Sequence, residues 1–440
     1  MKWGQVLALC SCALPAFAQS QYGGPAILSR GEAPAAMSAP EIDFRPYLGF
    51  YATYSSGLAN VSVNNEGGLA NQSSFGGALS WGISGTHSWR HTKLGLDYSG
   101  SLPHYLKNTA FDSISQSFLM GLTHRMSRHV TLSWRNSLGI FSRFHGQPTL
   151  ESTVPFDPAT TYTPVTDFFD NRTEYVSSQL DLMYQKSARL SFDFGGDGFV
   201  VKRRSTALYG VLGGGARGDV EYRVSRTATI GVQYSYMHYD FTKIFGGTDL
   251  HGAAVNFGKR LTKNAEFSLY GGFYRVESKF VEQVPVDPAI AALLGISTAL
   301  RVAHSINYVP NASARLSRTF SKGVAYAYAG RTITPGNGLF LTSLADNVGG
   351  GYGYSGVRHW AIGIGGGYTR AESLGNIRGG YSSSGGDGSI SRALGRNFHL
   401  SMDYSLRQYS SPTYDKYNRL VQSAAFGIAW SPGDVPLHIW

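Results

Sequence analysis

Apolar and polar residues alternate strictly in many segments of the chain. From Val130 to Leu138, the even-numbered positions read Val, Leu, Trp, Asn and Leu, and the odd-numbered positions are polar. The segments that follow Arg90, Arg226 and Arg396 show the same alternation. A period of two residues with one apolar face predicts β-strands.

Eight short polar units, each with a basic residue, separate these alternating segments. They fall at residues 88–91, 127–129, 186–189, 225–227, 262–264, 321–323, 357–359 and 395–397. Most intervals between them are about 37 residues, and two intervals are longer by about 22 residues. A repeat of this length suits a hairpin of two long strands with one tight turn and one loop.

One further strand is predicted at each end of the repeat, at Tyr47–Gly57 and at Leu420–Trp430. The expectation is an all-β fold, an antiparallel up-and-down barrel of about 18 strands that crosses a membrane. Sixteen strands remain possible, because glycines blur the alternation at 349–360 and 379–391. A soluble sandwich would also alternate, but its strands usually run about five or six residues.

Composition favours the barrel. The chain has 55 Gly, 13% aromatic residues and only 15% charged residues, against roughly 25% charged in an average soluble domain. Few charges, many glycines and many aromatics fit strands with one face in lipid. The formal charge is +10, but single Lys and Arg residues are spread along the whole chain, so no nucleic-acid partner is expected.

The first 18 residues are typical of a signal peptide for export. Lys2 precedes an apolar run, and Ala16-Phe17-Ala18 forms a small-x-small cleavage site. The apolar run is too short for a spanning helix, which needs ~20 residues. Residues 19–43, rich in Ala, Pro and Gly, are expected to form a flexible periplasmic lead, and residues 44–440 the barrel.

Charged residues on the polar strand faces are candidates to line the lumen. They are Asp97, Arg135, Asp181, Asp193, Glu221, Arg223, Glu266, Arg315, Arg331, Asp403 and Arg407. Opposed charges across a narrow waist would orient dipolar solutes and tune ion selectivity. For any single residue, simple solvation or pairing inside the barrel is an equally good explanation.

The two long intervals predict two long outward loops, 146–171 and 281–303. The first carries Glu151, Asp157, Asp167 and Asp170 without a basic residue. In the second, Asp287-Pro288 and Gly295 have the positions of an N-cap, a first helical residue and a C-terminal stop, which predicts a short helix. These five acidic residues are candidates for a constriction, although either loop could instead cap the rim.

No catalytic or cofactor-binding motif in the sequence has the flanking elements or spacing that its chemistry requires. Gly351, Gly353 and Gly356 match a Gly-x-Gly-x-x-Gly pattern, but a predicted turn follows them and not a helix. The 12 His are scattered without a metal-binding spacing. No enzyme activity, cofactor or metal is therefore expected. A lipid hydrolase with Ser, His and Asn on adjacent strands stays open, because no motif would reveal it.

The chain beyond the signal peptide resembles Gram-negative outer-membrane β-barrels, and in size and strand number the 18-stranded solute porins. It is also similar to barrel porins encoded with polysaccharide-export systems. Barrels of this kind typically end in an aromatic residue that the assembly machinery reads, and Trp440 matches that pattern. However, Pro432, Gly433 and Pro436 interrupt the end, so Phe426–Trp430 is a second candidate for the signal.

The resemblance implies an outer-membrane location, contact with its lipids, and passive diffusion of small hydrophilic solutes or saccharides. It also allows homo-oligomers. A surface adhesin or receptor-like barrel with a closed lumen is the main alternative function.

Overall fold

The computed structural model describes residues 42–59, 72–107, 109–112, 114–141, 172–287, 289, 295, 297–354, 356–357, 359–374, 379–395 and 397–431. The expected signal peptide (1–18), nearly all of the expected lead (19–43) and Trp440 lie outside these residues. The first strand begins at Ile42, two residues before the predicted start of the barrel.

Eighteen strands and two short 3-10 helices make up the described chain. The strands are β1 (Ile42–Leu58), β2 (Gln72–Ser88), β3 (Thr92–Tyr105), β4 (Ser115–Arg125), β5 (Val130–Phe141), β6 (Thr173–Gln185), β7 (Leu190–Arg203), β8 (Gly210–Arg223), β9 (Ala228–Thr242), β10 (Gly246–Thr262), β11 (Ala265–Pro285), β12 (Thr298–Phe320), β13 (Gly323–Thr334), β14 (Ser343–Tyr354), β15 (Trp360–Ser373), β16 (Gly380–Ala393), β17 (Phe398–Ser410) and β18 (Arg419–Trp430). The 3-10 helices are η4 (Thr109–Phe111) and η5 (Asp415–Tyr417).

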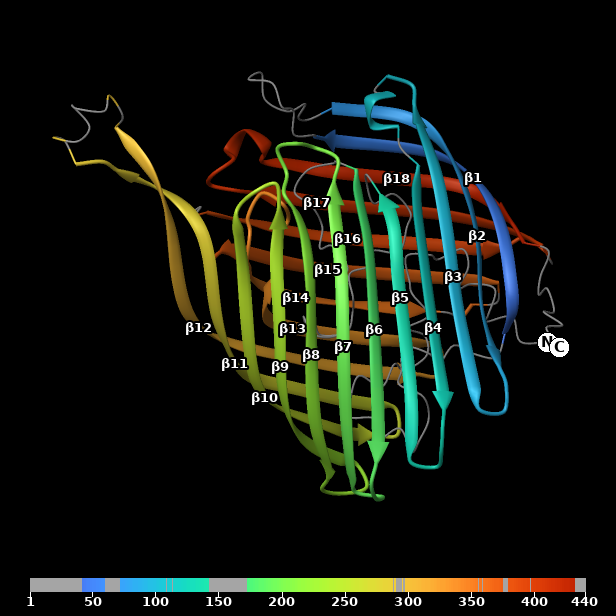
Figure 1. Ribbon diagram of the computed structural model, residues 1–440. Coiled ribbons are helices and arrows are strands. Elements are labelled where there is room, and N and C mark those ends of the chain that lie inside the picture. The colour runs from blue at the N-terminus through green and yellow to red at the C-terminus, as the bar shows by residue number, and fades with distance from the viewer. Residues whose placement is uncertain are drawn as a thin grey trace.

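The strands form one closed antiparallel sheet (Figure 1). Each strand pairs with its neighbours in sequence, and β1 also pairs with β18, from Leu48 opposite Trp430 to Ser56 opposite Gln422. This pairing leaves no sheet edge along the seam. The predicted antiparallel up-and-down barrel of 18 strands is confirmed, and the alternatives of a sandwich or of 16 strands are wrong.

All eight basic units fall at tight turns. The serines in these units form part of the turn: Ser127 Oγ accepts hydrogen bonds from the backbone N–H groups of His129 (3.2 Å) and Val130 (3.1 Å). Ser187 Oγ accepts equivalent bonds from Arg189 (3.2 Å) and Leu190 (3.1 Å). Such side-chain bonds satisfy backbone donors that the strand pairing leaves free, which explains why Ser recurs there.

The turns and the two ends of the sheet define the barrel's polarity. The eight tight turns lie at the same end as Ile42 and Trp430, and we call this the turn end. The other connections, most of them longer, lie at the opposite end, the loop end. In bacterial outer-membrane barrels the short turns face the periplasm and the longer loops face outward.

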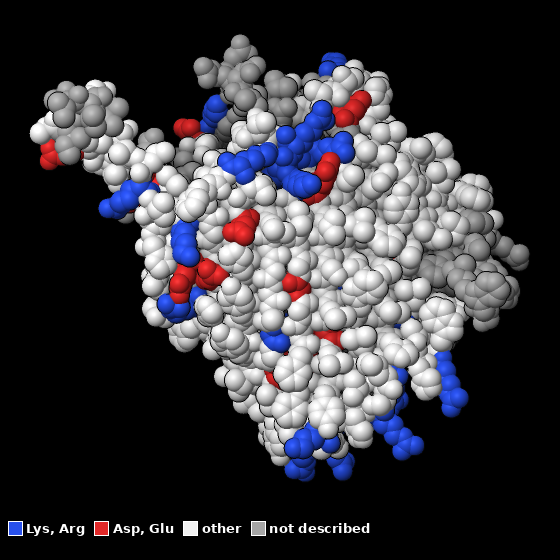
Figure 2. All heavy atoms as spheres, in the orientation of Figure 1, with Lys and Arg blue, Asp and Glu red and all other residues white. Residues whose placement is uncertain are grey.

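The two faces of the wall differ in chemistry. Over most of β6, buried residues such as Gln179 and Asp181 alternate with exposed ones such as Val176 and Leu180. We call the side with exposed apolar residues the outer face and the opposite side the inner face. In the view of Figure 2, Lys and Arg gather at the loop end and at the turns, and most of the surface between is uncharged. Within the described ranges, no helix is long and apolar enough to cross a membrane.

Candidate functional site

Ten of the eleven predicted lumen residues lie on the inner face. They are Asp97, Arg135, Asp181, Asp193, Glu221, Arg223, Glu266, Arg315, Asp403 and Arg407. Arg223 is at the turn end, where its Nε donates to the carbonyl oxygen of Ser225 (3.2 Å). Strand alternation therefore identifies most of the inner charges.

Arg331 is the exception and lies on the outer face. It is opposite Ala312 and Asp346 in the strand pairing, on the same face as Val348, which is 54% exposed. Its Nε and Nη2 contact the two carboxylate oxygens of Asp346 at 2.6 and 2.8 Å.

The reason for this error is the position of the basic residue within its turn. Lys263 is the first residue of the two-residue turn between Thr262 and Ala265, whereas Lys322 is the second residue of the turn between Phe320 and Gly323. When strand positions are counted from the basic residue of each turn, β13 is therefore displaced by one residue relative to β11. A shift of one residue moves every side chain of a strand to the other face.

Asp181 is the centre of a charged cluster on the inner faces of β5–β8. Its carboxylate contacts Arg135 Nη2 at 3.0 Å and Arg217 Nη2 at 2.6 Å, and it accepts a hydrogen bond from Gln179 Nε2. Arg217 Nε also lies 3.7 Å from Asp219. The Asp181 and Arg217 side chains are less than 10% exposed. An ion pair buried to this extent needs its partners, because an uncompensated charge would be costly.

Carboxylates outnumber guanidinium groups in this region. Besides Asp181 and Asp219, the inner faces of β7 and β8 carry Asp193, Asp197 and Glu221. The sequence analysis did not select Arg217, Asp219 or Asp197. The alternation could have identified two of them, because Arg217 and Asp219 lie four and two positions before Glu221, which was predicted to face the lumen.

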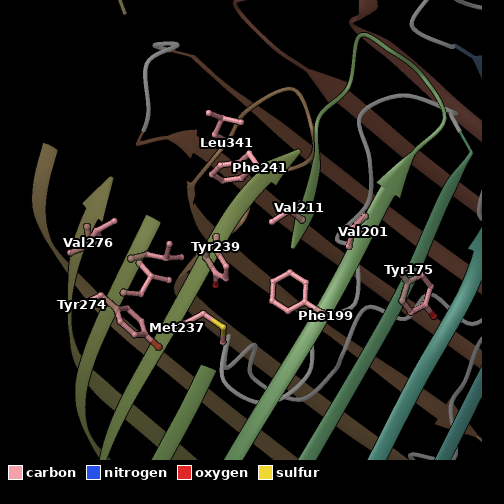
Figure 3. Close-up of a cluster of buried hydrophobic side chains, with 13 residues drawn as sticks. Tyr175, Phe199, Val201, Val211, Met237, Tyr239, Phe241, Tyr274, Val276 and Leu341 are labelled. Carbon is pink, nitrogen blue, oxygen red and sulfur yellow. The ribbon is translucent and has the colours of Figure 1, made fainter. Parts of the chain in front are cut away.

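Nearer the loop end, the inner face of β6–β12 is mostly apolar, with Arg203, Thr248 and Ser278 among its polar residues. A buried cluster there includes Tyr175, Phe199, Met237, Tyr239 and Tyr274 (Figure 3). Phe199 and Tyr239 meet edge to face with ring centroids 5.8 Å apart. The lumen wall thus changes from charged to mostly apolar along its length, a change that the sequence analysis did not predict.

The connection between β13 and β14 crosses the inside of the barrel. We call residues 335–342, Pro-Gly-Asn-Gly-Leu-Phe-Leu-Thr, the crossing segment. Its side chains Asn337, Phe340, Leu341 and Thr342 are at most 5% exposed. Leu341 belongs to the apolar cluster of Figure 3, and Thr342 Oγ1 lies 2.6 Å from Thr248 Oγ1 on the inner face of β10.

The crossing segment also contacts strands on both sides of the ring. The backbone N–H of Tyr209, in the β7–β8 connection, donates to the Gly338 carbonyl oxygen (2.8 Å). Phe340 stacks on Tyr381 of β16, with ring centroids 6.3 Å apart, and meets Tyr414 edge to face at 6.2 Å. Since β7 and β16 lie on opposite sides of β13 in the closed strand order, the segment can reach both only through the interior.

The conformation of the crossing segment depends on its glycines and on Asn337. Gly336 and Gly338 have φ angles of 73° and 87°. A Cβ on Gly336 would lie 1.9 Å from the carbonyl oxygens of Phe340 and Leu341. Asn337 Oδ1 accepts hydrogen bonds from the N–H groups of Leu339 (3.2 Å) and Phe340 (3.1 Å). The segment is therefore a tight, internally bonded turn.

Both ends of the predicted loop 281–303 are strand. β11 and β12 pair out to Pro285 opposite Thr298, so this insertion is a hairpin extension. β10 pairs with β11 only as far as Phe280, and β13 pairs with β12 only from Ala312. Beyond those points the two strands have no other neighbour in the described sheet, and they project from the loop end in Figure 1. We call this extension the arm.

Asp287 is exposed near the tip of the arm. Its Oδ1 accepts a hydrogen bond from the Ala289 N–H (2.9 Å), and Gly295 has a φ angle of 67°, as the predicted capping pattern requires. Most residues of the predicted helix lie outside the described chain, as do loop 146–171 and its candidates Glu151, Asp157, Asp167 and Asp170.

No family model matches the chain, and no curated protein matches it in sequence. Among solved structures, it is similar to the ferric citrate transporter FecA in the unliganded form, with 13% identity and a TM-score of 0.43 over 89% of this chain and 64% of that one. The chain therefore spans less than two thirds of the length of FecA.

Two further similar structures have lengths close to that of this chain. OccK2 (OpdF) of Pseudomonas aeruginosa shows 11% identity and a TM-score of 0.40 over 89% of this chain and 98% of that one. OccAB4 of Acinetobacter baumannii shows 10% identity and a TM-score of 0.39, with the same coverage. On its own geometry, a closed wall of 18 antiparallel strands with an apolar outer face, the chain has the fold of a transmembrane β-barrel.

Proposed function

We propose that the protein is an outer-membrane channel for passive diffusion of small hydrophilic solutes, saccharides among them. The observation that carries this proposal is a charged inner face, centred on Asp181, inside a closed barrel of 18 strands. Barrels of 16 to 18 strands enclose enough space for an aqueous channel. A wall of charged and amide side chains offers passing solutes the hydrogen bonds that they lose with water.

The crossing segment is the proposed constriction. It lies at the loop end, is buried on all sides and contacts inner-face residues such as Thr248 and Tyr381. Solutes entering from outside meet this segment before they reach the charged cluster. Its position therefore makes it the size-limiting element of the channel.

The proposed selectivity follows from the excess of carboxylates over arginines on β6–β8. Fixed negative charges in a pore raise the local concentration of cations and lower that of anions. Neutral and cationic solutes should therefore pass more readily than anionic ones of equal size.

The test replaces residues 335–342 with Asn-Gly, which joins Thr334 to Ser343. These two residues already pair across β13 and β14, and Asn-Gly forms the two-residue turn that hairpins favour. In planar bilayers the unmodified protein should give small conductance steps, and the variant should give steps several times larger. If both proteins migrate as folded barrels and neither conducts, the channel proposal is wrong.

The arm favours the alternative function of a surface receptor. Leu300 and Tyr308 on β12 are more than 70% exposed, and the arm projects beyond the barrel (Figure 1). Deletion of the arm separates the two functions. A receptor would lose binding of its ligand with conductance unchanged, whereas a channel without receptor function would lose neither.

A further inference from the structure

The outer face of β6 and β7 forms an ordered series of residue pairs from the turn end to the loop end. It begins at the aromatic pair Tyr184–Phe192, whose rings stack with centroids 6.3 Å apart. Leu182 opposite Phe194 and Leu180 opposite Gly196 follow, then Ser178 opposite Gly198, and the series ends with Val176 opposite Val200. From residue 184 to residue 176 the strand advances roughly 26 Å at ~3.3 Å per residue. At the ~40° tilt of barrel strands this length rises about 20 Å, which covers most of an apolar band of ~25 Å.

Charged residues begin immediately above the last apolar pair. Glu174 lies opposite Lys202. One step further, Arg172 and Arg204 face each other, and the Arg204 N–H donates to the Arg172 carbonyl oxygen (2.9 Å). We call these four residues the rim cluster. Its height, directly above the apolar band, is the height of the lipid head groups.

The rim cluster has three cations and one carboxylate. Arg172 Nη2 contacts Glu174 Oε1 at 3.1 Å, while Lys202 and Arg204 are exposed. Two like charges directly opposite in a strand pair repel each other. Glu174 can neutralise only one of the three positive charges, so among the described residues the cluster retains a net positive charge at this end of the wall. Figure 2 shows Lys and Arg gathered at this end of the wall.

Three other arginines on the outer face have carboxylate partners. Arg331 pairs with Asp346, Arg370 with Glu372 and Arg275 with Glu277. The rim cluster therefore differs from these sites in charge balance, although all of them lie on the outer face of the same barrel.

We propose that the rim cluster binds the phosphate groups of the phosphorylated glycolipid in the outer leaflet. Guanidinium and ammonium groups match phosphate oxygens in charge and hydrogen-bonding geometry. The acyl chains of the same lipid would lie along Val176 and Val200, directly below the phosphates. Anion and acyl chains would thus be recognised together on one pair of strands.

The experiment uses the full-length protein in detergent micelles and native mass spectrometry. The probe is a glucosamine-disaccharide lipid with two phosphates, compared with the same lipid after dephosphorylation. The test variant carries Arg172→Ala, Lys202→Ala and Arg204→Ala. We expect its affinity for the phosphorylated lipid to fall by about two orders of magnitude, and the unmodified protein to prefer the phosphorylated form.

The matched control carries Arg275→Ala, Arg331→Ala and Arg370→Ala, which also removes three outer-face cations. It should bind the lipid as the unmodified protein does. Equal losses in both variants, or no loss in the test variant while it migrates as a folded barrel, would overturn the proposal. Displacement of the lipid by inorganic phosphate at the same concentration would also overturn it, because the cluster would then be a simple anion site.

Discussion

At the scale of single residues, Arg217 and Arg331 allow a direct comparison of the two faces. Both have carboxylate partners, but Arg217 lies on the inner face and Arg331 on the outer face. Arg217→Met removes a positive charge from the lumen, so the permeability ratio of K⁺ to Cl⁻ should rise by about twofold or more. Arg331→Met should leave this ratio unchanged. Reversal potentials in a KCl gradient measure both effects, and equal ratios in the two variants would contradict the assignment of faces.

Two glycines with left-handed backbone test the crossing segment. Gly336→Ala places a Cβ against two backbone carbonyl oxygens, whereas a Cβ at Gly295 on the arm meets nothing within 4 Å. Both substitutions carry a similar cost from the positive φ angle, on the order of 1 kcal/mol. Only Gly336→Ala should loosen the constriction, which would appear as larger or more variable single-channel conductance. Matching changes in the two variants would mean that the packing around Gly336 does not hold the segment.

Alternation in the sequence predicts the face of a residue only when the number of residues in the preceding turn is known. The inner positions of Asp97, Arg135 and Asp403 follow from the pattern alone. The prediction for Arg331 was wrong because the sequence around Lys322 does not reveal that this lysine is the second residue of the turn between β12 and β13. Contacts between strands, such as that of Asp181 with Arg217, depend on the register of separate hairpins, which a single sequence does not specify.

At the scale of elements, two connections between strands differ in direction: the arm projects away from the barrel, and the crossing segment lies inside it. Replacement of residues 281–302 with Asn-Gly joins Phe280 to Ala303, which pair with each other. Because the removed strands have no other neighbour in the described sheet, the melting temperature and the conductance should not change. Circular dichroism on heating and planar-bilayer recordings check the two expectations. A clear drop in melting temperature would show that the arm braces the barrel.

Length was a poor guide to which connection enters the lumen. The long interval at residues 281–303 predicted a loop that could enter the lumen or cap the rim, but its two ends pair with each other as extensions of β11 and β12. The crossing segment is only eight residues long and so gave no length signal. Its Pro-Gly-Asn-Gly sequence predicts a turn, but the direction of that turn is set by contacts with Tyr209, Thr248 and Tyr381.

At the scale of the whole molecule, the seam between β1 and β18 completes the sheet. Trp430 is the last residue paired on both sides, with Leu48 and with Phe398. We predict that this strand end, Phe426–Trp430, is the signal read by the assembly machinery. Trp430→Ala should lower the amount of assembled barrel in cells several-fold, whereas truncation after Ser431 should not. Heat-modifiable gel mobility of membrane fractions measures the assembled form.

Refolding of purified Trp430→Ala in detergent separates recognition from stability, since the variant should still close without the machinery. The opposite pattern, with truncation harmful and Trp430→Ala harmless in cells, would assign the signal to Leu437–Trp440.

The strand number and closure were predictable because a period of about 37 residues repeats along the chain. Each hairpin carries its own turn and alternation, so an error in one hairpin does not change the topology.

The arm is also a suitable site for inserting foreign peptides into the barrel. Peptide added beyond Pro285 and before Thr298 would extend a hairpin whose strands pair only with each other in the described sheet. If the loop end faces outward, foreign epitopes, affinity tags or fluorophore-binding sequences placed there would be displayed on the cell surface, beyond the strands that enclose the lumen. The same insertion would report orientation in living cells, because only a correctly assembled barrel exposes that tip to an antibody from outside.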